Sequence, residues 1–337
     1  MSARERQPVA VLGAGSWGTA LAILLAGHGH PTRLWGRDPA FMASLARERR
    51  NPRYLPDNPF PPALEPVADL DAAVAGCPLV LVAVPSHGFR EQIRRTAPLL
   101  APRARLAWAT KGLEPDSGRL LHQVAREELG ADRPVAVISG PTFAREVAAG
   151  LPTAVTVAAS DEDCAAAFAA LLHGQSFRAY TSTDIVGVEL GGAVKNVLAI
   201  AAGISDGLGF GANSRAALIT RGLAELMRLG EALGGHRETF MGLAGVGDLV
   251  LTCTDDQSRN RRLGLYLGQG RTLESALEAI GQVVEGVGTA RETVKLRDST
   301  GVEMPITEQV YRMLWEGVTP REAVQALLAR EPKPEAP

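Results

Sequence analysis

The segment PVAVLGAGSWGTALAILLAG, residues 8–27, decides how the first half of the chain folds. A short apolar stretch leads into Gly13-x-Gly15-x-x-Gly18, and an apolar helical pattern follows. In a dinucleotide-binding turn, the first glycine permits the tight turn, the second lets a pyrophosphate approach the backbone, and the third lets helix and strand pack closely. The helix N-terminus adds free N–H groups and partial positive charge. This context predicts a nucleotide site, and the alternative is a glycine turn that serves packing alone.

The rest of the first half alternates short apolar stretches with amphipathic ones. Strands are expected within residues 8–15, 31–38, 78–86, 103–112, 133–141 and 151–159. Helical patterns fall at 18–30, 41–50 and 118–130. Such βαβα alternation predicts an α/β fold with a doubly wound, mostly parallel sheet of the Rossmann type.

The second half has a different texture, because strand signals stop near residue 184 and long helical patterns take over. Thr272 and Thr319 are expected N-caps of two of these helices, and Thr319 is followed by Pro320 and Glu322. A chain of 337 residues is also long for one compact core. We therefore expect a nucleotide-binding domain at 1–186, an all-helical domain at 187–330 and a frayed tail at 331–337.

Composition excludes several classes of protein. The formal net charge is −2, so there is no electrostatic case for nucleic acid or an anionic membrane. No apolar run is expected to reach the ~18 residues that span a bilayer, and no signal peptide is recognised. The three cysteines are widely spaced, so neither a disulfide framework nor a metal site is expected. We expect a cytoplasmic protein with no integral membrane segment.

Lys195 stands out in LGGAVKNVLAIAAGI, residues 190–204, because this helical segment is otherwise apolar. Its neighbours three and four positions away are Gly191, Gly192, Leu198 and Ala199, and none can pair with an ammonium. An unpaired buried charge costs several kcal/mol, roughly. Either the lysine has a function, with the small neighbours leaving room for ligands, or its ammonium snorkels to the surface.

Polar residues follow two of the expected strands. Lys111 lies in ATKGL, and Gly140, Thr142 and Ala144 lie in SGPTFARE. Ligands of open α/β sheets bind beyond the carboxyl ends of the strands. Lys111 and Thr142 are therefore candidates for a site at that edge.

A third polar group occurs in the helical half, in LAGVGDLVLTCTDDQSRNRR, residues 243–262. Ser258 is a good N-cap, and the amides behind it together with the Arg259 guanidinium suit an anion. The plainer alternatives are that Asp248 and Ser258 act only as caps. Arg261 and Arg262 are expected to form a solvated face.

The end of the second strand bears on the choice of cofactor. NAD-binding domains usually carry an acidic residue at this tip, whereas here Arg37 occupies it, with Arg33 nearby. A guanidinium suits a 2′-phosphate, which favours NADP over NAD. Asp38 follows directly and leaves NAD possible, and Arg37 as a solvated surface residue is the alternative.

Nearly the whole chain resembles the bacterial NAD(P)-dependent glycerol-3-phosphate dehydrogenases. The motifs match in order, and they include GAGSWGTALA, VPSH, ATKGL, VISGPTFAREVAAGLPTA, LGGAVKNVLAIAAGISDGLGFGANSRAALITRGLAE, GDLVLTCT, SRNRRLG, VVEGV and EMPIT. The resemblance implies a Rossmann domain followed by a helical domain of the 6-phosphogluconate dehydrogenase C-terminal type. It also implies interconversion of dihydroxyacetone phosphate and sn-glycerol 3-phosphate, a link to glycerophospholipid synthesis, and a homodimer.

The resemblance also implies residue roles. Lys195 would be the catalytic acid–base residue, and His87 of VPSH would shape the pocket without a catalytic role. The implied substrate contacts are Lys111, Gly140, Thr142, Lys195, Asp248, Ser258, Arg259 and Asn260. Besides the three glycines of the turn, the implied cofactor contacts are Ser16, Trp17, Arg37, Tyr54, Lys111, Ala144, Arg259, Val283 and Glu285.

Two rival functions stay open at this point. One is another dehydrogenase of the same two-domain build that acts on a hydroxy acid, which would not need a phosphate cradle at Ser258–Asn260. The other is a catalytically silent protein that binds NADP as a sensor. Such a protein would be expected to lack Lys195 or Asp248, and both residues are present here.

Overall fold

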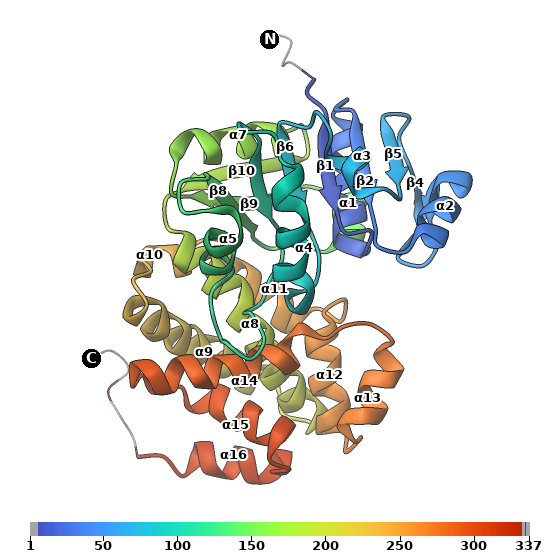
Figure 1. Ribbon diagram of the computed structural model, residues 1–337. Coiled ribbons are helices and arrows are strands. Elements are labelled where there is room, and N and C mark those ends of the chain that lie inside the picture. The colour runs from blue at the N-terminus through green and yellow to red at the C-terminus, as the bar shows by residue number, and fades with distance from the viewer. Residues whose placement is uncertain (1–5, 332–333, 335–337) are drawn as a thin grey trace.

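The computed structural model describes residues 6–331 and residue 334 (Figure 1). Its first part contains an eight-stranded sheet in the order β10-β9-β8-β7-β6-β1-β2-β5. The strands are β1 (Val9–Leu12), β2 (Thr32–Trp35), β5 (Leu64–Val67), β6 (Leu79–Val82), β7 (Arg105–Trp108), β8 (Val135–Ser139), β9 (Thr153–Ala159) and β10 (Phe177–Ser182). Only the β8–β9 pair is antiparallel among these neighbours, so the predicted mostly parallel sheet is confirmed.

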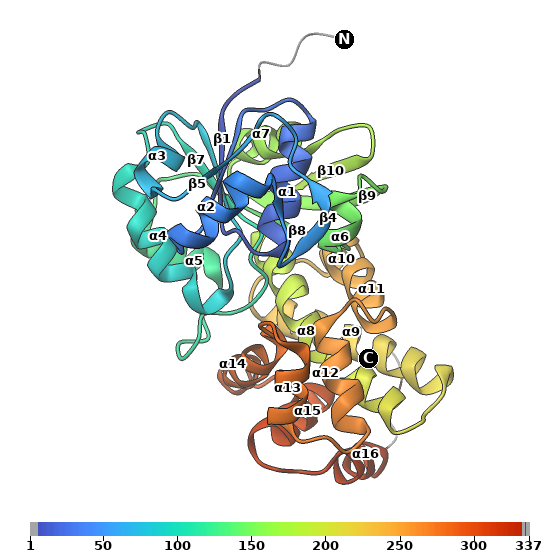
Figure 2. The ribbon, with the colours of Figure 1, turned by 90° about the vertical axis from the view of Figure 1, so that its right-hand side faces the viewer.

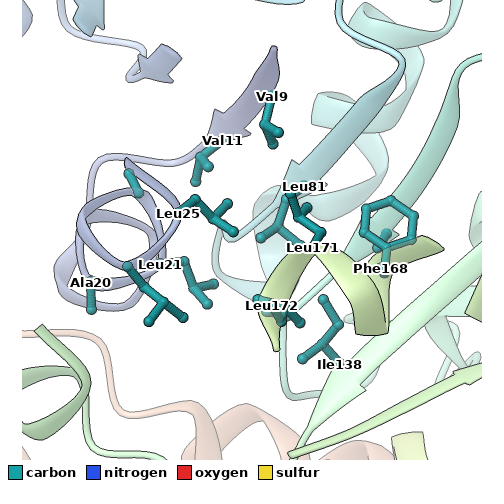
Figure 3. Packing of buried hydrophobic residues seen from close by; sticks show 14 of the residues in the cluster. Val9, Val11, Ala20, Leu21, Leu25, Leu81, Ile138, Phe168, Leu171 and Leu172 are labelled. Atoms are coloured by element: carbon teal, nitrogen blue, oxygen red, sulfur yellow. The ribbon is translucent and has the colours of Figure 1, made fainter. Parts of the chain in front are cut away.

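Helices cover both faces of the sheet (Figures 1 and 2). They are α1 (Ser16–Gly27), α2 (Pro39–Glu48), α3 (Leu70–Val74), α4 (Phe89–Thr96), α5 (Leu121–Leu129), α6 (Ala144–Ala148) and α7 (Glu162–Leu172), with short turns η1 (Ser86–Gly88) and η2 (Ala97–Leu99). Val9 and Val11 of β1 pack with α1 and α7 on one face (Figure 3), whereas Ala10 and Leu12 pack on the other. This alternation is the period of two that a strand buried on both faces requires.

All six predicted strands are present, and four further strands were missed. β5 and β10 are the two edges of the sheet, and β3 (Arg50–Asn51) and β4 (Leu55–Pro59) form a small separate hairpin. Their sequences lack an apolar run because edge strands are partly exposed, and β4 reads LPDNP. Hydrophobic pattern alone therefore does not reveal them.

The second part is helical in the described residues. Its elements are α8 (Ile185–Gly207), α9 (Ala212–Ala232), α10 (Arg237–Phe240), η3 (Leu243–Gly247), α11 (Asp248–Thr254), α12 (Arg259–Gly268), α13 (Leu273–Ile280), α14 (Glu285–Thr300), α15 (Pro305–Trp315) and α16 (Pro320–Leu328). The predicted caps Thr272 and Thr319 accept hydrogen bonds from Ser275 and Glu322. The predicted division at 186/187 falls in the first turn of α8 and stays a prediction. The predicted tail at 331–337 lies outside the described residues except for 331 and 334.

α8 is the central helix of this part. Its apolar window has a mean hydropathy of 1.6, so by length and composition it is the one described helix that could cross a membrane. The expectation that no run reaches this length was therefore wrong. However, 94% of that window is buried inside the protein, and α9, α11, α12 and α14 pack around it (Figure 2). This is how the core helix of a helical bundle is expected to look.

Glycines let α12 approach α8 at backbone distance. A Cβ at Gly203 would lie 2.1 Å from the Arg261 carbonyl oxygen, and one at Gly264 would lie 2.0 Å from that of Ile200. Gly207 and Gly268 continue the contact one turn further along. Because no side chain separates the two helices, the first turn of α12 is held beside the middle of α8, where Lys195 lies.

Gly191 and Gly192 have the same role on another face of α8. A Cβ at Gly191 would lie 2.2 Å from the Ala244 carbonyl oxygen of η3, and one at Gly192 would lie 2.6 Å from Ser139 Oγ. The expectation that these glycines leave room for ligands is therefore wrong. They let η3 and the end of β8 pack against the lysine helix.

Candidate active site

The glycine turn after β1 has the geometry that the sequence predicts. Gly13 has φ +126°, and a Cβ there would lie 2.5 Å from the Ala83 carbonyl oxygen. A Cβ at Gly18 would lie 1.8 Å from the Gly13 carbonyl oxygen, so this position permits close packing. At Gly15, by contrast, nothing lies within 4 Å of such a Cβ. α1 starts at Ser16 without a side-chain cap, so its first N–H groups and the open space at Gly15 fit a pyrophosphate.

Asn51 ties a second segment to this turn. Its buried side-chain amide donates to the Ala14 carbonyl (3.1 Å) and to Thr19 Oγ1 (2.9 Å), and its Oδ1 accepts from Tyr54 N (3.2 Å). The Tyr54 ring stacks edge-on against Phe41, with centroids 6.3 Å apart. Sequence reasoning missed Asn51, since an asparagine in a polar loop carries no periodic signal. Trp17 packs against the hydrophobic core beside the turn.

The three charged residues in and just after β2 make different interactions. Arg37 is exposed and has no hydrogen bond or ion pair among the described residues. Asp38 caps α2, where its Oδ1 accepts from Ala40 N and Phe41 N. Arg33 donates to the carbonyls of Ala72 and Ala75 at the end of α3, so its predicted place near the cofactor is not supported.

Lys195 is buried, with 6% of its surface exposed, so the snorkelling alternative is wrong. Its ammonium donates to Asp248 Oδ1 and to Thr252 Oγ1 (2.8 Å) of α11. No partner lies one helical turn away in sequence because the partner comes from another helix, 53 residues on.

Asp248 joins Lys195 to Lys111. Its second oxygen, Oδ2, accepts from Lys111 Nζ at 2.8 Å, and the carboxylate is 1% exposed. The Lys111 ammonium also donates to the Gly140 carbonyl (2.8 Å) and lies 3.4 Å from Thr142 Oγ1. The alternative in which Asp248 is only a helix cap is therefore wrong, because both of its oxygens are bound to lysines.

This triad leaves one positive charge in a buried place, from two ammoniums and one carboxylate. Burial lowers the pKa of Lys195 to about 8, and the Lys111 charge acts in the same direction, while Asp248 opposes the shift. A lysine with a pKa near 8 can give and accept a proton at neutral pH. The sequence analysis finds no partner for this lysine, so Asp248 as a direct partner is new in the structure.

The predicted anion cradle lies at the start of α12. Ser258 Oγ accepts from Arg261 N (3.2 Å), so Ser258 is the N-cap, as predicted. Asn260 donates to Oδ1 of Asn196 (2.9 Å), which is the residue directly after Lys195 in the chain. The Oδ1 of Asn260 accepts from Gly286 N (2.9 Å). Burial lowers the pKa of the Arg259 guanidinium, and the nearby Glu285 carboxylate opposes this shift. The cradle is thus hydrogen-bonded to α8 at the residue that follows Lys195.

Arg261 corrects the expectation of a solvated face. Its side chain is buried and donates to the Cys253 carbonyl (3.1 Å), to Asp206 Oδ2 (2.6 Å) and to Asp256. It therefore fastens the loop before α12 to α8. Arg262 is half-buried, and its Nε has no acceptor among the described residues.

The remaining candidates come from three other segments of the chain. Ala144 is the first residue of α6, directly after the segment that holds Gly140 and Thr142. Val283 is 44% exposed, and Glu285 is the first residue of α14. His87 is exposed in η1 and has no contact with the lysine triad among the described residues. No group of three or more metal-binding side chains gathers within residues 6–331 and 334.

Two family models match the chain in succession. The model of the NAD-dependent glycerol-3-phosphate dehydrogenase N-terminus matches residues 8–165, and that of its C-terminus matches residues 184–325.

The chain is also similar to named proteins over nearly its full length. It is 63% identical to the glycerol-3-phosphate dehydrogenase (NAD(P)+) of Thioalkalivibrio sulfidiphilus, over 98% of this chain and 99% of that protein. It is 62% identical to the protein of the same name from Nitrosococcus oceani, over 98% and 96%. The crystal structure of glycerol-3-phosphate dehydrogenase from Coxiella burnetii aligns with a TM-score of 0.93 at 52% identity, over 96% of this chain and 99% of that one.

Proposed function

Because the chain belongs to the NAD-dependent glycerol-3-phosphate dehydrogenase family, we propose that it is an NAD(P)-dependent oxidoreductase that reduces dihydroxyacetone phosphate reversibly to sn-glycerol 3-phosphate. The observation that supports this most is the Lys195–Asp248–Lys111 triad beyond the strand ends. It combines a proton donor of suitable pKa with a net positive charge, and α1 offers the nucleotide an N-terminus without a side-chain cap.

Lys195 is proposed as the acid–base group. The nicotinamide supplies a hydride to the carbonyl carbon when it is bound. The Lys195 ammonium polarises the carbonyl oxygen and gives it a proton as negative charge develops there, and the neutral amine takes that proton back in the oxidising direction. Asp248 and Thr252 hold Nζ in place, and Lys111 adds a second positive charge.

The cradle at the start of α12 is proposed to bind the phosphate. Ser258, Arg259 and Asn260 combine helix N–H groups with a half-buried guanidinium, and such donors favour a dianionic ester. Gly140 and Thr142 lie against the Lys111 ammonium, where they are placed to contact the glycerol end. A dehydrogenase acting on a carboxylate-only substrate would not need this phosphate cradle, which argues against the hydroxy-acid alternative.

NADP is proposed as the preferred cofactor, with NAD possible. The Arg37 guanidinium is exposed at the tip of β2, while the neighbouring Asp38 is occupied as a helix cap. The Arg37 guanidinium is therefore available to bind a 2′-phosphate. We further propose that the protein works in the cytoplasm as a homodimer and feeds glycerophospholipid synthesis.

The test is NADPH oxidation followed by absorbance, with dihydroxyacetone phosphate beside unphosphorylated dihydroxyacetone and with NADH in parallel. Turnover of the phosphate ester alone supports both the reaction and the cradle. Reduction of a 2-oxo or 3-oxo acid in its place would favour the hydroxy-acid dehydrogenase. Binding of NADPH without turnover of any of these compounds would favour the silent sensor.

A further inference from the structure

The Val-Pro-Ser-His motif at residues 84–87 has no role in the function proposed above, yet it joins the two parts of the chain. Ser86 is 8% exposed and lies just past β6. Its backbone N–H donates to Glu285 Oε1 (3.2 Å), and its hydroxyl donates to Glu285 Oε2 (2.6 Å). One residue just after a strand of the sheet thus binds both oxygens of a carboxylate that lies 199 residues further along the chain.

The end of β7 is shaped to admit this contact. A Cβ at Gly112 would lie 2.8 Å from Ser86 Cβ and 3.3 Å from Glu285 Oε2, so a larger residue after Lys111 would push the pair apart. The Thr110 hydroxyl donates to the Val84 carbonyl (2.7 Å) and so holds the ends of β7 and β6 together. Ser86, Glu285 and their two hydrogen bonds are called the Ser86–Glu285 clasp below. The Thr110–Val84 hydrogen bond holds the segment that carries Ser86 in place.

On the other side, the clasp sets the start of α14. Glu285 is its first residue, where the helix dipole favours a carboxylate. The next residue, Gly286, donates to Asn260 of the anion cradle, and the Glu285 charge lies close to Arg259. Moving Glu285 would therefore disturb the cradle as well.

The order of the sheet indicates which ligand passes here. β6 lies between β1, which leads into the glycine turn, and β7, which leads to Lys111. A dinucleotide whose pyrophosphate lies at the glycine turn must pass the end of β6 to bring its reacting ring to Lys195. Ser86 and Glu285 stand at that point, where a fixed carboxylate can accept hydrogen bonds from ribose hydroxyls.

We propose that Ser86 is a positioning residue for the nicotinamide half of the cofactor, which it serves by clasping Glu285 across the two parts of the chain. The proposal rests on the proposed function for one point only, that the ligand is NADPH. Ser86 itself needs no contact with the reacting atoms.

The experiment measures NADPH affinity from nucleotide fluorescence, with no carbonyl substrate present. The variants are Ser86→Ala, Glu285→Ala and the double variant. Ser86→Ala is expected to weaken NADPH binding about tenfold, the usual scale for one hydrogen bond to a charged group. In the Glu285→Ala background the same change is expected to have little further effect, because Ser86 acts through Glu285. Ser86→Thr keeps the hydroxyl and should restore most of the affinity.

Ser44→Ala is the matched control, since the Ser44 hydroxyl donates only to the Phe41 carbonyl within α2 (2.7 Å). An unchanged affinity in Ser86→Ala overturns the proposal, and so does an equal loss in both backgrounds or a loss that threonine does not repair. If the clasp effect is found but dihydroxyacetone phosphate is not reduced, only the proposed substrate fails. If the wild-type protein binds neither NADPH nor NADH, both proposals fail.

Discussion

The nucleotide end and the lysine end of the candidate site differ in the groups that form them. Around the glycine turn the features that suit a ligand belong to the backbone, namely open space at Gly15, a positive φ at Gly13 and an α1 N-terminus without a side-chain cap. At the lysine end, charged side chains are buried and paired, as in Lys195 with Asp248. A backbone site tolerates the loss of one side chain, whereas a buried charge pair does not. Substitutions should therefore have graded effects at the first end and severe effects at the second.

The largest effect is expected from Lys195→Ala. Removing the acid–base group should lower the turnover rate by about 10³-fold, within the 10²–10⁴ range of general acid–base catalysis. NADPH binding should persist, because the glycine turn lies in the other part of the chain. The measurements are steady-state NADPH oxidation and nucleotide fluorescence on the same preparation. Retention of a tenth or more of the wild-type rate would refute the acid–base assignment.

Asp248→Asn comes next, and it is expected to shift the pH profile as well as the rate. With Lys195 as the proposed acid–base group, reduction needs its ammonium, so wild-type kcat/KM for reduction should fall as pH rises through the lysine pKa of about 8. Asp248 favours the charged form. Its loss should therefore move that fall to lower pH and cut the rate about 10²-fold at pH 8.

Exposed Asp132→Asn is the matched control for this pH profile, because it changes the same group at the surface of the sheet part. The oxidising direction should show the opposite slope, since it needs the neutral amine. A pH profile that Asp248→Asn leaves in place would mean that Lys195 does not set it.

The same contrast explains how much the sequence predicts. The glycine turn, the six strands with apolar runs and the caps at Thr272 and Thr319 are local patterns, and each is present in the structure. The partners of Lys195 and Arg261 are not local, because they come from other helices. Spacing along one helix therefore predicts an unpaired Lys195 and a solvated Arg261, whereas Asp248 binds the first and Asp206 and Asp256 bind the second.

The role of Gly191 and Gly192 could not be predicted from the sequence for a related reason. Sequence pattern shows that Gly191 and Gly192 have no side chain, but it does not show what fills the space beside them. In the structure the Ala244 backbone and Ser139 fill it, so these glycines position the lysine helix instead of admitting a ligand. Which element approaches a glycine depends on the chain path as a whole.

At the nucleotide end, Arg37→Asp should have a smaller and more selective effect. If Arg37 binds a 2′-phosphate, the ratio of kcat/KM for NADPH to that for NADH should fall about 10–100-fold, on the scale of hydrogen bonds to a charged group. Folding should be unaffected because Arg37 is exposed. Arg47→Asp, on the exposed side of α2, is the control for charge alone. An unchanged ratio would remove Arg37 from the cofactor site.

The smallest effect is expected from Thr252→Val, which tests how far the lysine end depends on each partner. Lys195 donates to both Thr252 and Asp248, and the threonine hydroxyl in turn donates to the Asp248 carbonyl within α11 (2.6 Å). Valine has nearly the same shape, so packing is kept while one neutral acceptor of the ammonium is lost. A hydrogen bond to a charged group contributes about 1.5–3 kcal/mol, and at the lower end of that range its loss lowers the rate roughly tenfold. The pH profile should move slightly to lower pH, in the same direction as for Asp248→Asn. A loss as large as that of Asp248→Asn would mean that geometry at Nζ, and not the carboxylate charge, sets the reactivity of Lys195.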